Sequence, residues 1–158
     1  MKLASLKKLS LDEFSDEAQK IFEIRKDFHY DQYFYSLLRN KSKSQIFEFY
    51  YQIESNESSI NNLSKEHSSG SEKSKLGIIG PVNLVNINSE IAKVLKFSKD
   101  SVINDPIEIN NEWYLIQREK FIQAKYGEFF KNQICMELFE RQLEKEYEEQ
   151  YLNLTTIN

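Results

Sequence analysis

The sequence predicts an α+β fold, in which a small, mainly antiparallel sheet is surrounded by helices and bracketed by one helix at each end. Two observations carry this prediction. Short aromatic or branched apolar runs alternate with stretches whose apolar residues recur every three or four positions. Two of only four glycines bound the run Gly77-Ile78-Ile79-Gly80, which is typical of a short buried strand that enters a sharp turn.

The spacing of apolar residues predicts the helices. Helical stretches are expected over residues 11–28, 44–53, 59–67, 87–95 and about 124–152. Asn88 or Ser89 is a suitable N-cap for the fourth of them, since both side chains accept hydrogen bonds from free backbone N–H groups. The glutamate cluster of the last helix is expected to form a solvated face.

Three further runs predict strands. Residues 33–38 are aromatic and apolar, which suits a strand. Residues 106–109 and 113–116 flank Asn110-Asn111, and asparagine tolerates the left-handed backbone that a tight β-hairpin needs. With the glycine-bounded run, the element order is α, β, α, α, β, α, β, β, α, so about four strands are expected.

Composition restricts the class of protein. The 158 residues fit one domain, and 40% hydrophobic residues suffice for a core. A net charge of −4 argues against nucleic acid as a partner. Cys135 is the only cysteine, which excludes an internal disulfide, and it is expected to be a buried packing residue. No apolar run reaches the roughly 18 residues of a membrane span, and no signal peptide is evident, so a cytoplasmic protein without a membrane partner is expected.

Residues from about 30 to 121 resemble the parvulin-type (PpiC/rotamase) peptidyl-prolyl cis-trans isomerase domain. The helix that ends in Lys65-Glu66-His67-Ser68 is similar to the family's Ala-Lys-x-x-Ser helix. Nine residues later, Gly77-Ile78-Ile79-Gly80 stands where the family has Gly-Asp-Leu-Gly. Asp105-Pro106-Ile107 and Trp113-Tyr114-Leu115-Ile116 resemble the family's closing hairpin. The end helices are similar to those of bacterial parvulin chaperones.

The resemblance implies isomerisation of X-Pro bonds in a polypeptide, a reaction that needs no covalent step, cofactor or metal. It also implies a hydrophobic seat for the proline ring. The family's Leu, Met and Phe positions fall on Ile79, Ile87 and Ile91. Plain core packing is the alternative for these isoleucines.

The family's polar residues are replaced in this chain. Its two histidine positions fall on Ser36 and Tyr114, and its Cys/Asp position falls on Gly70. Ser36 and Tyr114 are expected to lie on neighbouring strands, where a hydrogen bond between them would stand in for the histidine pair. We therefore expect weak isomerase activity, with a catalytically silent peptide-binding chaperone or adaptor as the alternative.

Three segments are expected: an N-terminal helical segment (1–29), the parvulin-like domain (30–122) and a long C-terminal helix (123–158) that packs with the N-terminal one. The two end helices either bind a polypeptide client or cover one face of the sheet; both alternatives remain open. Arg39, Lys41 and Lys43 are expected in a basic loop after the first strand. That loop would favour an acidic residue before the proline, unless it is simply solvated.

Overall fold

The computed structural model describes residues 11–156, which divide into two compact units. The central unit comprises Asp27–Ala124, and the end unit combines the flanking segments from both termini. The described residues contain no helix that is both long and apolar enough to cross a membrane.

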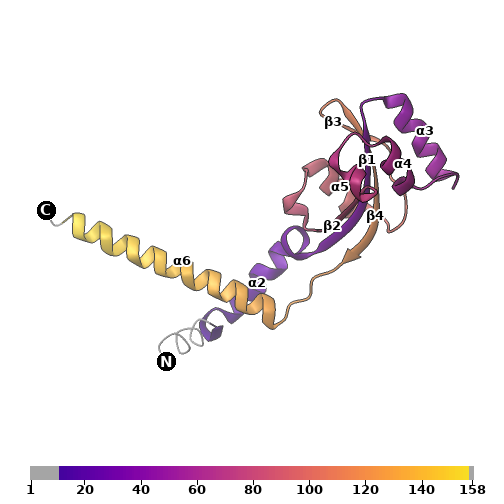
Figure 1. Cartoon of the computed structure of the whole chain (residues 1–158). Helices are drawn as coiled ribbons and strands as arrows, with labels where there is room; N and C mark the ends of the chain where they lie inside the picture. Colours follow the sequence, from indigo (N-terminus) through magenta and orange to yellow (C-terminus); the bar gives the residue numbers. More distant parts are fainter. Residues whose placement is uncertain (1–10, 157–158) are drawn as a thin grey trace. The chain divides into compact units, whose positions relative to one another are not determined.

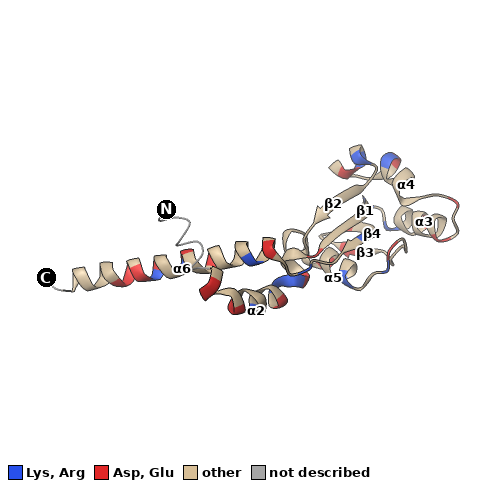
Figure 2. Cartoon of the chain, turned by 90° about the horizontal axis from the view of Figure 1, so that it is seen from below, with Lys and Arg blue, Asp and Glu red and all other residues tan. Residues whose placement is uncertain are grey.

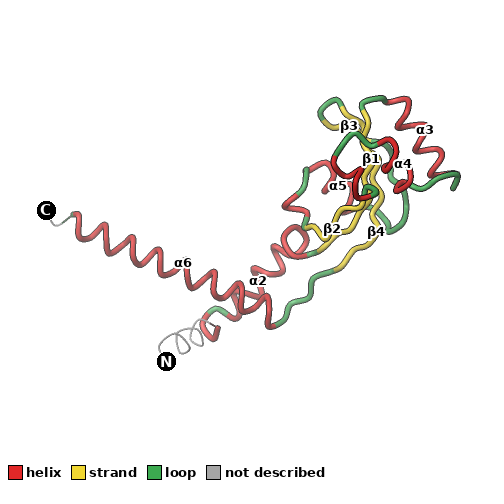
Figure 3. The backbone as a smooth tube through the Cα atoms, viewed as in Figure 1, coloured by secondary structure: helices red, strands yellow, loops and turns green. Residues whose placement is uncertain are grey.

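The central unit is built on a four-stranded antiparallel sheet (Figures 1 and 3). Its strands lie in the order β2-β1-β4-β3, which makes β2 and β3 the edges. The strands are β1 (Gln32–Asn40), β2 (Ile78–Val82), β3 (Ile107–Ile109) and β4 (Glu112–Ile122). The predicted α+β fold with a small antiparallel sheet is confirmed.

Helices cover both faces of this sheet (Figure 1). On one face, α3 (Lys43–Glu54) and α4 (Ile60–His67) pack against the sheet. On the other face lie the short 3₁₀ segment Leu84–Asn86 and α5 (Ser89–Phe97). A second 3₁₀ segment, Ser71–Lys75, connects α4 to β2, and a π-helical turn, Lys26–Tyr30, precedes β1.

The helices begin where the sequence offers caps. The Asn88 side chain accepts hydrogen bonds from the N–H groups of Glu90 and Ile91, as expected for the start of α5. Ser42 and Ser59 cap α3 and α4 in the same way. These caps determine the residue at which each helix begins, and so they determine which of its residues face the sheet.

The glycine-bounded run forms β2, but it is not buried as expected. It is an edge strand, and Ile78 is 47% exposed. Gly77 has φ +75°, and a Cβ at this position would lie 2.5 Å from the Leu37 carbonyl oxygen and 2.6 Å from Ser64 Oγ. The glycine is therefore required by a close backbone crossing beside β1, and not by burial of the strand.

The end unit contains α2 (Ser15–Arg25) and α6 (Glu128–Thr155), which pack against each other. The Phe22 ring lies 5.2 Å from the ring of Tyr126 and 5.1 Å from that of Phe130. Arg25 donates hydrogen bonds to both carboxylate oxygens of Glu137, at 2.9 and 3.0 Å. The helix expected over residues 11–28 is therefore interrupted. Residues 11–13 are helical, a bend at Phe14 separates them from α2, and the π-helical turn follows α2.

Candidate functional site

The candidate site lies on the sheet face that α5 covers. Strand alternation places Tyr35 and Arg39 of β1 on this face, since side chains two residues apart share a side. Tyr35 pairs across the strands with Ile79 of β2, and Arg39 pairs with Tyr114 of β4. Three of the four strands therefore contribute side chains to one surface.

The apolar part of the site contains the three isoleucines that the resemblance singled out. Ile91 is a buried member of the core cluster beneath α5, and Ile79 and Ile87 are partly buried against the same cluster. Tyr114 also packs against it. The three isoleucines thus belong to one core cluster beneath α5, with Ile79 and Ile87 partly exposed at its margin.

Ser36 lies on β1, next to the strand that carries Tyr114, as expected, but the two side chains are on opposite faces of the sheet. The partner of Ser36 on β4 is Gln117. Ser36 Oγ donates to Glu119 Oε1 at 2.7 Å and accepts from Asn61 Nδ2 at 2.9 Å. A hydrogen bond between Ser36 and Tyr114, which would have stood in for the histidine pair, does not form, because side chains at adjacent positions of a strand point to opposite faces. Tyr35, one residue earlier, occupies the β1 position that faces the site.

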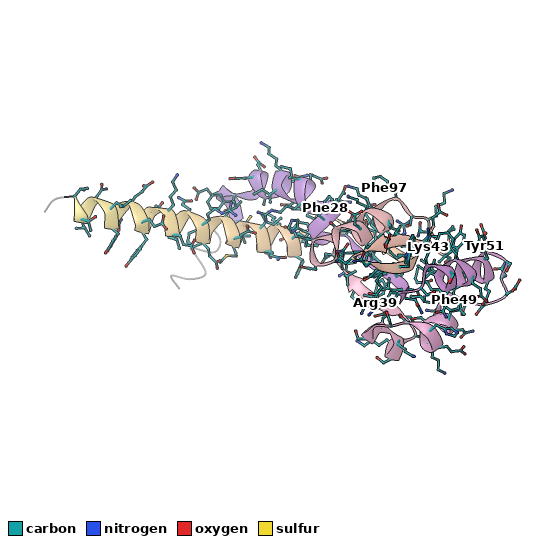
Figure 4. The ribbon with its side chains drawn as sticks, turned by 90° about the horizontal axis from the view of Figure 1, so that it is seen from above. Phe28, Arg39, Lys43, Phe49, Tyr51 and Phe97 are labelled. Atoms are coloured by element: carbon teal, nitrogen blue, oxygen red, sulfur yellow. The ribbon has the colours of Figure 1, made fainter. Side chains whose placement is uncertain are left out.

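The polar part of the site is centred on Arg39, whose side chain is labelled in Figure 4. Arg39 Nε donates to Glu72 Oε1 at 3.0 Å, and Arg39 Nη1 lies 3.8 Å from Glu112 Oε2. Burial alone would lower the pKa of the Arg39 guanidinium, but hydrogen bonds with Tyr114 and Glu72 outweigh it and raise that pKa. The guanidinium is a fixed positive charge between two carboxylates.

Gly70 is the reason that this guanidinium fits. A Cβ at Gly70 would overlap Arg39 Nε and Nη2 as well as Glu72 Oε2, all inside the 3.0 Å that real Cβ atoms essentially never show. Its backbone, with φ −104° and ψ −179°, is an ordinary extended one. The space beside Gly70 that a side chain would need is therefore filled by the Arg39–Glu72 pair.

Glu72 is the buried partner of the ion pair and holds Arg39 in position. Its side chain is 5% exposed, and it accepts a hydrogen bond from Ser68 Oγ as well as from Arg39. Burial raises the pKa of the Glu72 carboxyl, but hydrogen bonds from Ser68, its own backbone N–H and Arg39 bring that pKa below its ordinary value. The carboxylate is thus ionised at neutral pH.

Tyr35 is buried, at 3% exposure. Burial, and then the negative charge of Glu72, raise the pKa of its hydroxyl to about 12. Neither Tyr35 nor Glu72 is predicted as a site residue from the sequence. A signal for Tyr35 existed, since Tyr33, Tyr35, Leu37 and Arg39 share one phase of the strand.

The basic loop that was expected after β1 differs in the structure. Arg39 belongs to β1 itself, and its charge is paired with carboxylates. Lys43 is the first residue of α3, and its Nζ lies 5.0 Å from the centre of the Trp113 ring. Only Lys41 stands in the connection between β1 and α3.

Other groups that bear chemistry are separate from this surface. The His67 ring stacks on Phe49, with 4.7 Å between the ring centres. Cys135 is fully buried in the end unit, where burial raises the pKa of its thiol. Across residues 11–156, His, Cys, Asp and Glu side chains form no cluster that would hold a metal ion.

Solved structures of low sequence identity share this fold. The peptidylprolyl isomerase PrsA of Bacillus anthracis is 19% identical, with a TM-score of 0.61 over 87% of this chain and 61% of its own. The foldase PrsA of Streptococcus pneumoniae is 17% identical, with a TM-score of 0.58 over 85% of this chain and 52% of its own. This chain thus spans about half to three fifths of the length of these PrsA proteins.

A third similar structure comes from work on PEB4 and Cj1289, two SurA-like chaperones of Campylobacter jejuni. It is 13% identical, with a TM-score of 0.59 over 99% of this chain and 68% of its own. A search of curated protein sequences finds no significant match.

A sequence model of one family matches more than half of the chain. It describes the rotamase, or PPIC-type PPIase, domain, and it covers residues 28–120. This range includes the whole sheet except the last residues of β4, and every residue of the apolar and polar parts described above. The chain belongs to the family of PPIC-type peptidyl-prolyl isomerase domains.

Proposed function

We propose that this chain catalyses the cis-trans isomerisation of X-Pro bonds in polypeptide clients, at the surface formed by the three isoleucines and the Arg39–Glu72 pair. Its family supports an isomerase or chaperone-like function. The observation that carries the proposal is the position of the polar pair. It lies at the edge of the apolar surface, where Tyr114 contacts both parts.

The chemistry requires little beyond such a surface. An X-Pro amide isomerises over a barrier of about 20 kcal/mol, because twisting breaks its partial double bond. Ile79 and Ile87 would seat the proline ring and exclude water from the amide. Polar groups at the rim would hold the carbonyl of the preceding residue out of plane.

We expect the reaction to be slower than in relatives that keep the family's histidines. Removing one well-placed donor from an active site lowers the rate by about 10²- to 10³-fold. Arg39, Tyr114 and Tyr35 compensate for only part of this loss, because two of the three are held by neighbouring side chains.

The proposal is tested by NMR exchange spectroscopy on a short Ala-Pro peptide. The wild-type chain should accelerate exchange in proportion to its concentration, and Ile79→Ala should reduce that rate by removing part of the seat. Ile78→Ala is the matched control, because this neighbouring isoleucine pairs with Ser36 and lies in the other phase of β2. Equal rates with and without the chain would refute an isomerase.

A holding chaperone is the second candidate, and one observation on the end unit favours it. Every residue from Glu140 to Thr155 of α6 is exposed, among them Leu143, Tyr147 and Tyr151, which recur at four-residue steps on one side of the helix. Acidic residues lie among them (Figure 2). Such an apolar stripe is available to an unfolded client.

This candidate has its own test. The chain should suppress the light scattering of a thermally unfolded client, and the double variant Tyr147→Ser/Tyr151→Ser should suppress it less. Gln150→Ser, on the same exposed helix, is the control. Suppression that is equal in all three proteins would show that the stripe does not bind the client.

A further inference from the structure

We infer that the Tyr35 hydroxyl is the catalytic hydrogen-bond donor to the twisting prolyl amide. It takes the place of Ser36, to which the family resemblance assigns one of the two histidine positions. This inference rests on the proposed isomerase function. It assigns to a buried tyrosine of β1 a role that neither the family match nor the fold assigns to it.

The position of Tyr35 supports the role. Its partner across the sheet is Ile79, the central residue of the apolar seat, so the two side chains leave neighbouring strands on the same face. The ring is buried in the same core cluster as Ile91. A ring held in this way by packing keeps its hydroxyl in one place, which is what a preorganised donor requires.

The hydroxyl itself is free to act. Among the described residues, none forms a hydrogen bond with the Tyr35 hydroxyl, although the residue is 3% exposed. The buried side-chain atoms that lack a partner in the described chain are Tyr126 Oη and Asn132 Oδ1, so the Tyr35 oxygen is not among the sealed ones. A buried ring that ends in an accessible, unpartnered donor leaves room for a ligand's acceptor.

The other hydroxyls at the site are already engaged. The Tyr114 hydroxyl donates to Glu112 Oε2 at 3.5 Å, and its interaction with Arg39 raises the pKa of that guanidinium. Ser68 Oγ donates to Glu72. Of the hydroxyls of Tyr35, Tyr114 and Ser68, only that of Tyr35 can therefore turn to a substrate without first breaking a bond within the protein; the hydroxyl of Tyr33 belongs to a residue that pairs with Val82 and Phe121, not with the isoleucines of the seat.

The charge of Glu72 keeps Tyr35 in its donor form. Burial and this carboxylate raise the pKa of Tyr35 to about 12, so the hydroxyl retains its proton throughout the physiological range. Arg39 and Ser68 occupy Glu72, which leaves the Tyr35 proton for the substrate. The Arg39–Glu72 pair thus acts as a positioning element, and Tyr35 contacts the amide.

The experiment compares Tyr35→Phe with Tyr33→Phe. Both tyrosines are 3% exposed, both lie on β1, and both belong to the same core cluster, so the control removes a hydroxyl from an equivalent environment. We expect kcat/KM for Ala-Pro exchange to fall at least about tenfold in Tyr35→Phe, mostly through kcat, because the donor acts on the twisted state. Tyr33→Phe should keep the wild-type rate.

The outcomes separate the inference from the proposed function. Wild-type exchange that is equal to buffer alone would overturn both. An active wild type with an unchanged rate in Tyr35→Phe would overturn the inference and leave the function intact. Equal losses in the two variants would also overturn it, since they would indicate a general effect on packing. The temperature of unfolding, measured for each protein, shows that the compared chains are folded.

Discussion

Gly70→Ala is the sharpest test of how the polar part of the site is built. One added methyl group would enter the space that Arg39 Nε, Arg39 Nη2 and Glu72 Oε2 now fill. The backbone of Gly70 is extended with a negative φ, so alanine adopts it without strain. The substitution therefore acts on the ion pair alone.

The expected loss follows from the burial of the two partners. Both side chains must move, and the 3.0 Å bond from Arg39 Nε to Glu72 Oε1 must lengthen or break. Breaking a fully buried ion pair costs about 3–5 kcal/mol. Arg39 is 31% exposed and Glu72 keeps its bond from Ser68, so the loss should be smaller, about 2 kcal/mol.

Urea titration followed by the fluorescence of Trp113 measures this loss. Trp113 is the only tryptophan of the chain, and it lies in the central unit, so the signal reports that unit. A loss of about 2 kcal/mol lowers the urea midpoint by about 1 M.

A double-mutant cycle decides whether the reasoning is right. In an Arg39→Ala background the guanidinium no longer occupies the space, so Gly70→Ala should lose at least about 1 kcal/mol less than it does in the wild type. If Gly70→Ala has the same effect in both backgrounds, or less than about 0.5 kcal/mol in the wild type, the glycine does not serve the ion pair.

Three other predictions concern stability. Tyr126→Phe should raise the free energy of unfolding of the end unit by up to about 1 kcal/mol, because the tyrosine oxygen is buried without a partner in the described chain; a lower calorimetric midpoint would contradict this. Leu76→Gly should stabilise the central unit by about 1 kcal/mol, since Leu76 has φ 57° and is 41% exposed; a reduced urea midpoint by Trp113 fluorescence would show that its packing outweighs the strain. The Tyr35 hydroxyl has a pKa of about 12 in the fold against 10 in the free side chain, so its contribution is fully present below pH 10 and is lost as pH rises toward 12. Wild type should thus lose up to about 3 kcal/mol more than Tyr35→Phe between pH 9 and 12, and parallel profiles would refute this.

The fold could be predicted from the sequence because its elements carry local signals. The hairpin is one example: Asn110 and Asn111 have φ 51° and 63°, so both adopt the left-handed backbone that their side chains tolerate. The Asn88 cap of α5 is another. In both places, the chemistry of a few neighbouring residues determines the local structure without help from distant contacts.

The phase of β1 could not be predicted in this way. Tyr35, Ser36, Leu37 and Leu38 are all buried, because helices cover both faces of the sheet. A strand that is buried on both sides shows no alternation of polar and apolar residues, and a one-residue error then exchanges its faces. Because of such a one-residue error, the sequence predicts Ser36 at the site, whereas Tyr35 is the residue of β1 that faces it.

The Arg39–Glu72 pair could not be predicted from the sequence for a different reason. Arg39 and Glu72 are separated by 33 residues, and their contact depends on the empty side of Gly70. Neither residue type is unusual on a surface, and no local pattern connects them. Only the path of the chain from α4 into β2 brings the carboxylate under the guanidinium.

The edges of the sheet determine how readily another extended chain can pair with it. An exposed edge invites another extended chain to join it as an additional strand, which leads to aggregation. Here β2 carries Pro81, which has no N–H to donate, and β3 is three residues long, with exposed Glu108 at its centre. If the chain binds unfolded polypeptides as proposed, it can therefore bring its site close to them while its own sheet offers them a poor template for an added strand.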